Sequence, residues 1–170
     1  MSDDLDENIS SLFQRLLPFI STIILVMLFY MPLGFFSLNG IRPVLALGCV
    51  YFWLQHRPDV FNLWSVFAVG LIDDILSSSP LGVNIFEMLM MYVLVNATTK
   101  FFNAKPFVVL WYGFVLLSFV VILTKWLLVS VYYSQFLPLS MLFFSYVITI
   151  ATYPLLSLIL AFVQNKLMKD

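Results

Sequence analysis

Residues 70–82 read GLIDDILSSSPLG, and they place two adjacent carboxylates, Asp73 and Asp74, in a chain that is otherwise strongly apolar. The serines and the proline at 77–80 are turn-forming, so they predict the end of one helix and the start of the next. A carboxylate near the C-terminus of a helix faces the negative pole of the helix dipole. At membrane depth it is also costly unless it faces protein, a polar cavity or the headgroups. Because both costs fall on Asp73 and Asp74, these residues are the first candidates for function.

The composition predicts an integral membrane protein. Of the 170 residues, 62% are hydrophobic and 10% are charged, whereas a soluble domain is about 45–50% apolar and about 25% charged. A net charge of −1 excludes a basic nucleic-acid-binding surface. One cysteine and one histidine exclude an intrachain disulfide and disfavour a zinc site. No metal, cofactor or nucleic acid is therefore expected.

Six apolar segments predict an all-α, polytopic bundle of about six transmembrane helices, at residues 16–36, 43–54, 62–76, 81–99, 106–131 and 137–164. Residues 1–15 form a short segment before this membrane domain, and residues 165–170 form a tail after it. These segments are longer than the strands of a membrane barrel, which have about ten residues. A spanning helix needs about 20 residues. The second and third segments are shorter, so either they span fully or they form a re-entrant pair.

The positive charges predict the orientation. If all six segments cross, six basic residues lie on the side of the N-terminus, namely Arg15, Arg57, Lys100, Lys105, Lys166 and Lys169. Arg42 is then the only basic residue in an outer loop. Both termini are therefore expected in the cytoplasm. A re-entrant second and third segment would leave the other spans oriented in the same way.

This topology brings polar residues from four segments into one outer layer of the membrane, and they are the candidate structural, partner or pocket residues: Arg42, Asp73, Asp74, Asn84, Glu87 and Lys125. Long basic side chains such as Lys125 can also snorkel to the headgroups. Glu87 lies about 9 Å below the outer face, and we expect it to face the bundle interior with a partner or to carry a proton. Neighbours on a helix point about 100° apart, so one carboxylate of the Asp73–Asp74 pair is expected to face inward and the other outward.

Four motifs resemble the family of the rod shape-determining protein MreD, most strongly over residues 41–82. They are Arg42 followed by Pro43, Tyr51 separated by one residue from Trp53, Arg57 followed by Pro58, and the run at 70–82. Asp74 matches the acidic position that is characteristic of the family, and Asp73 is a variant neighbour. The family usually has a glycine near Ser78, where this chain differs. Asp74 is therefore expected to be the functional carboxylate of the turn and to pair with Arg42 or Lys125.

The resemblance implies a small protein of the bacterial inner membrane that belongs to the cell-elongation complex. Its partners there would be MreC, the actin-like MreB, and the polymerase and transpeptidase of lateral peptidoglycan synthesis. The family's fold is similar to the substrate-binding component of energy-coupling-factor transporters, and no enzymatic reaction is assigned to it. We therefore expect a membrane scaffold that binds MreC.

The sequence leaves two alternative functions, a transporter-like binding protein and an intramembrane enzyme. A transporter-like protein that binds a small molecule or a lipid would expose its carboxylates to an outward pocket, whereas a scaffold would use them for helix packing. An intramembrane enzyme is disfavoured, because adjacent residues on one helix cannot supply the geometry of a two-carboxylate site.

Overall fold

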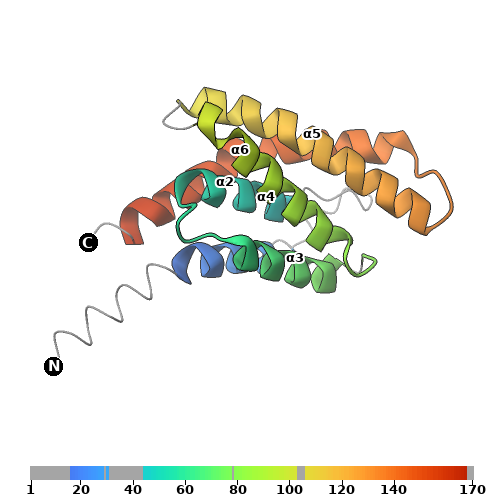
Figure 1. Cartoon of the computed structure of the whole chain (residues 1–170), viewed down its shortest axis with the longest axis horizontal. Helices are drawn as coiled ribbons and strands as arrows, with labels where there is room; N and C mark the ends of the chain where they lie inside the picture. The colour runs from blue at the N-terminus through green and yellow to red at the C-terminus, as the bar shows by residue number, and fades with distance from the viewer. Residues whose placement is uncertain (1–15, 29, 31–43, 78, 103–105, 168–170) are drawn as a thin grey trace.

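The computed structural model describes residues 16–28, 30, 44–77, 79–102 and 106–167 (Figure 1). These residues form helices and connecting turns, and none of them lies in a strand, which confirms the all-α class. The helices are an N-terminal one at Leu16–Leu28, α2 at Leu45–His56, α3 at Leu63–Ser77, α4 at Val83–Phe102, α5 at Phe107–Tyr132 and α6 at Leu139–Leu167.

Helices α2 to α6 begin one or two residues after the starts of the corresponding predicted segments and end one to three residues after their ends. Because α6 continues to Leu167, residues 165–167 of the predicted tail are helical. Residues 1–15, 29, 31–36, 43 and 168–170 of the predicted segments lie outside the described part of the chain.

Two of the described helices are long and apolar enough to cross a membrane, at Phe107–Tyr132 and Leu139–Lys166. At 1.5 Å per residue they measure about 39 and 42 Å, more than the roughly 30 Å of a bilayer core. The other apolar stretches, Leu16–Leu28 and Val83–Thr98, are shorter. Length and composition therefore support two spans directly.

Helix α2 forms the centre of the bundle. All its residues from 45 to 54 are buried, and it packs mainly on α4 and α6. The Tyr51 hydroxyl donates to the backbone oxygen of Leu110 in α5 at 2.8 Å. The ring of Tyr153 in α6 lies 5.7 Å from the Tyr51 ring. A helix that is apolar on all sides is stable only where other elements surround it, and here α4, α5 and α6 do so.

Helices α3 to α6 form two antiparallel hairpins, α3 with α4 and α5 with α6 (Figure 1). In the first hairpin the two backbones approach closely at Gly70, where an added Cβ would lie 2.7 Å from the Cα atom of Ile85. The connecting turn contains Gly82 at φ +100°, a conformation that residues with a Cβ rarely adopt. Glycines thus set both the spacing of the hairpin and the path of its turn.

We expect Gly70→Ala to destabilise the protein, because the new methyl group meets a backbone atom that cannot move without separating α3 from α4. Overpacking of this kind costs about 1–3 kcal/mol. Gly48→Ala is the matched control, since a Cβ there meets only side-chain atoms of Leu156 and Tyr153 at 3.5 Å or more. Thermal unfolding in detergent should show a lower midpoint for Gly70→Ala alone, and equal midpoints would contradict the close approach.

Candidate functional site

The candidate site is a buried polar cluster where α3 ends, α4 begins and the C-terminal part of α5 passes. Asp73 and Asp74 are 4% and 1% exposed, and Asn84 and Glu87 are 0% and 1% exposed. The side chain of Lys125 is 23% exposed. Arg42, the sixth predicted member, lies outside the described residues. The structure therefore brings together the five predicted residues that it describes.

Asp73 and Asp74 are both buried, so the prediction that one of them faces outward is wrong. Their side chains do diverge around α3, but protein covers both directions. Asp73 accepts a hydrogen bond at 2.9 Å from the hydroxyl of Tyr30, which follows the N-terminal helix. Asp74 faces the start of α4. The prediction assumed that other helices cover only one side of α3. At its C-terminal end two sides are covered, one near Tyr30 and one by the start of α4.

Asp74 caps the N-terminus of α4. Its carboxylate accepts hydrogen bonds from the backbone N–H groups of Gly82 at 2.8 Å, Asn84 at 2.9 Å and Ile85 at 3.4 Å. The first N–H groups of a helix have no partner within the helix, and the dipole there favours a negative charge. The N-terminus of α4 therefore offsets the unfavourable position of Asp74 at the C-terminal end of α3.

Of the two partners predicted for Asp74, Lys125 is wrong because it binds Glu87 instead, and Arg42 lies outside the described residues. The Lys125 ammonium lies 2.6 Å from the Glu87 carboxylate. The ammonium therefore turns inward and joins α5 to α4. Glu87 faces the bundle interior with a charged partner, which was one of the two alternatives open for it.

Two further residues contribute to the cluster that sequence reasoning did not select, Tyr30 and Ser77. The Asn84 amide donates to the Ser77 hydroxyl oxygen at 2.7 Å, and the Ser77 hydroxyl donates to Ser79 at 2.9 Å. The sequence assigns Ser77 to the turn and to the helix cap that follows it, not to the polar cluster. Tyr30 lies fourteen residues after Leu16, or about 21 Å along a helix, and this depth could have placed it in the outer layer.

The geometry of the cluster is that of a helix junction. Each carboxylate contacts a different neighbour: Tyr30 for Asp73, the α4 backbone for Asp74, and Lys125 for Glu87. Among the described residues, no group of three or more His, Cys, Asp and Glu side chains is arranged to hold a metal ion. The arrangement fixes α3, α4 and α5 relative to one another.

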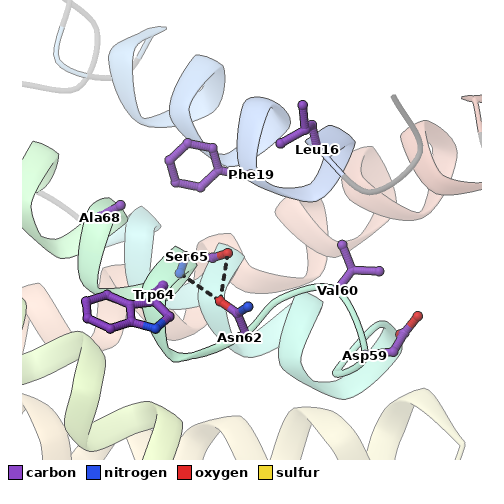
Figure 2. Close-up of a pocket in the computed structure, with 8 residues that line it drawn as sticks. All are labelled: Leu16, Phe19, Asp59, Val60, Asn62, Trp64, Ser65 and Ala68. Carbon is purple, nitrogen blue, oxygen red and sulfur yellow. Dashed lines mark hydrogen bonds between the residues drawn. The ribbon is translucent and has the colours of Figure 1, made fainter. Parts of the chain in front are cut away.

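A separate pocket of about 700 Å³ lies at the other end of α3, between the N-terminal helix and the α2–α3 turn (Figure 2). Its lining residues are Leu16, Phe19, Asp59, Val60, Asn62, Trp64, Ser65 and Ala68. The Asn62 side chain accepts the backbone N–H of Ser65 at 3.1 Å and so caps α3. A hydrogen bond from Arg57 holds the pKa of the Asp59 carboxyl below its usual value. None of the predicted site residues lines this pocket.

Comparison with known families decides the identity. The family of the rod shape-determining protein MreD matches residues 8–168, nearly the whole chain. The chain belongs to the MreD family. An uncharacterized protein of Rickettsia prowazekii (strain Madrid E) is 23% identical over 150 residues, which cover 86% of each chain. No solved structure matches the chain, so the similarity to energy-coupling-factor components stays a prediction.

Membership of the MreD family gives this chain a role in determining rod shape. The family is one of structural, shape-determining proteins. The two long apolar helices fit a membrane protein of this family.

We expect Asp74→Asn to destabilise the fold more than Asp73→Asn. An asparagine at 74 removes the charge and turns an NH₂ group toward backbone N–H donors, and losing hydrogen bonds to a charged group costs roughly 1.5–3 kcal/mol. Asp73→Asn keeps a side-chain oxygen that can accept the hydrogen bond from the Tyr30 hydroxyl, so we expect a smaller loss of stability. Thermal unfolding of the two purified variants measures the difference, and a larger loss for Asp73→Asn would refute the assignment of Asp74 as the cap.

Proposed function

We propose that this protein is a membrane scaffold of the bacterial cell-elongation complex, needed for rod shape and lateral peptidoglycan synthesis. The match of the MreD family to residues 8–168 carries the proposal. The buried cluster supports a scaffold over a transporter, because its carboxylates join helices to one another. A transporter-like binding protein would instead direct them into an outward pocket.

The partner in this proposal is MreC, with MreB and the elongation polymerase and transpeptidase bound directly or through MreC. The outer faces of α5 and α6 support it, since large apolar side chains there are exposed, among them Leu116 at 68% and Leu158 at 70%. In a bilayer, helices associate through close packing and hydrogen bonds rather than through the ordinary hydrophobic effect. A spanning helix of MreC is a suitable occupant for part of such a face.

We place the protein in the inner membrane with six crossings and both termini in the cytoplasm. The excess of basic residues on the N-terminal side supports this orientation. Contacts between helices agree with it, because the N-terminal helix lies beside Ser65 near its start and beside Asp73 near its end, so it runs parallel to α3. Two parallel helices require one crossing between them, and α2 is the helix that connects them.

Depleting the protein from a rod-shaped host should make the cells round, because lateral wall synthesis would lose a structural subunit. Cell width and length measured by microscopy provide the readout. Re-expression of the wild-type chain should restore rods, and Asp74→Asn should restore them poorly. Unchanged rods that have lost the uptake of a nutrient would support the transporter alternative instead.

MreC should crosslink to this protein in intact membranes and co-purify with it in mild detergent. Photo-crosslinking residues placed at Leu116 and Leu158, on exposed faces of α5 and α6, should capture it on at least one of the two helices. A crosslinker at Met88, which is fully buried, is the matched control and should capture nothing. Capture of MreC at neither exposed position, together with its absence after purification, would count against the scaffold.

Reporter fusions test the orientation. A fusion after Gln164 should be active in the cytoplasm, because six crossings separate it from the N-terminus. A fusion after Gly40 should be active in the periplasm, because one crossing separates it from the N-terminus. A periplasmic signal after Gln164 would mean an odd number of crossings and would move the polar cluster to a different depth.

A further inference from the structure

Among the described residues, no hydrogen-bond donor reaches two oxygen atoms of the buried cluster, Oε1 of Glu87 and Oδ1 of Asn84. Both side chains are at least 99% buried. The two residues are three positions apart on α4, so they lie next to each other on one face of the helix. A buried acceptor without a donor destabilises a protein, and most buried polar atoms in proteins are paired. Two adjacent acceptors can take hydrogen bonds from one group that carries several donors.

The charges around these atoms favour a cation. Asp73, Asp74 and Glu87 lie close enough to interact electrostatically, and among the described residues Lys125 is the ammonium that interacts with all three. Asp74 is offset by the N-terminus of α4, and the hydrogen bond that Asp73 accepts from a described residue comes from the neutral hydroxyl of Tyr30. A primary ammonium group supplies both a further positive charge and N–H donors.

Lys125 adds a second element of recognition. Its ammonium has three N–H donors, and the described contact with Glu87 uses one of them. Its side chain is also 23% exposed, so it connects the buried cluster with the surface of the bundle. The other N–H groups of the Lys125 ammonium can donate to a phosphate. The site thus combines acceptors for an ammonium with a cation for a phosphate, which together match a zwitterion.

The cluster also lies at the right depth for a lipid headgroup. Glu87 is four residues after the start of α4 at Val83, and Lys125 is seven residues before the end of α5 at Tyr132. At 1.5 Å per residue, these distances are about 6 and 10 Å from the helix ends. Both residues therefore lie near the membrane surface in a chain that spans the bilayer.

We propose that Asn84, Glu87 and Lys125 form a binding site for a phosphoethanolamine headgroup. Its ammonium donates to Glu87 Oε1 and Asn84 Oδ1, and its phosphate binds the Lys125 ammonium. The surrounding bilayer supplies this group as phosphatidylethanolamine. The site depends on the membrane placement of the helices and not on the binding of MreC.

The test compares two lipids that differ only in N–H donors. The purified protein is placed in nanodiscs of phosphatidylglycerol that contain equal amounts of phosphatidylethanolamine and phosphatidylcholine, and native mass spectrometry counts the lipids that stay bound. Phosphatidylcholine has the same charges and phosphate, but its quaternary ammonium has no N–H group. We expect retention of phosphatidylethanolamine to exceed that of phosphatidylcholine by roughly tenfold, which is the value of one charge-assisted hydrogen bond.

Variants locate the site. Glu87→Gln should abolish most of the preference, and Asp59→Asn, a carboxylate variant at the other end of α3, should leave it unchanged. If Glu87→Gln does not fold, the double variant Glu87→Met with Lys125→Met replaces the whole ion pair, a change that proteins often tolerate. That variant should fold and lose the preference.

Equal retention of the two lipids by the wild-type protein would overturn the proposal, and so would a preference that survives in the double variant. A preference that arises only in Arg42→Ala would mean that this chain's own guanidinium fills the site, and it would also overturn the proposal. Competition by free phosphoethanolamine would support the headgroup chemistry and identify a soluble source. Because the readout is lipid retention, its failure leaves the scaffold proposal untouched.

Discussion

The carboxylate of Asp74 on the first N–H groups of α4 is the interaction on which the hairpin depends. It joins the negative pole at the end of α3 to the positive pole at the start of α4 through a single side chain. Because the carboxylate binds N–H groups of three residues, Gly82, Asn84 and Ile85, it fixes how far α4 is rotated about its own axis. That rotation decides which residues of α4 face α5, and Glu87 is among them.

Close packing reinforces the same arrangement. Gly70 lies one turn before Asp74, and its missing side chain allows the backbone of α4 to approach at Ile85, next to the N–H groups that Asp74 binds. The Glu87–Lys125 pair then fixes the second hairpin against the first. Buried ion pairs of this kind add little net stability over apolar residues of the same size. Their effect is on register, since a shift of α5 by one turn would leave two charges without partners.

The sequence was sufficient for those features that depend on composition and spacing along a single helix. The apolar segments indicated the helices, and the depth of Asn84, Glu87 and Lys125 indicated one layer. It was insufficient where the partner is a backbone group or lies on a helix of unknown rotation. Asp74 binds N–H groups, which every residue except proline has, so no residue type marks the site. Asp73 binds Tyr30, and only the placement of the N-terminal helix beside α3 shows this.

The central position of α2 has a consequence for how the chain is made. Helix α2 has twelve residues, and those from 45 to 54 are all buried against other helices. It leaves the ribosome before α4 and α6, the helices on which it packs. A helix of this length covers about 18 Å of the roughly 30 Å hydrocarbon core, so the crossing that we propose for α2 also uses residues on either side of it. The core is therefore complete only when α6 has been synthesised and inserted, and a nascent chain that stops before Leu139 lacks one wall around α2.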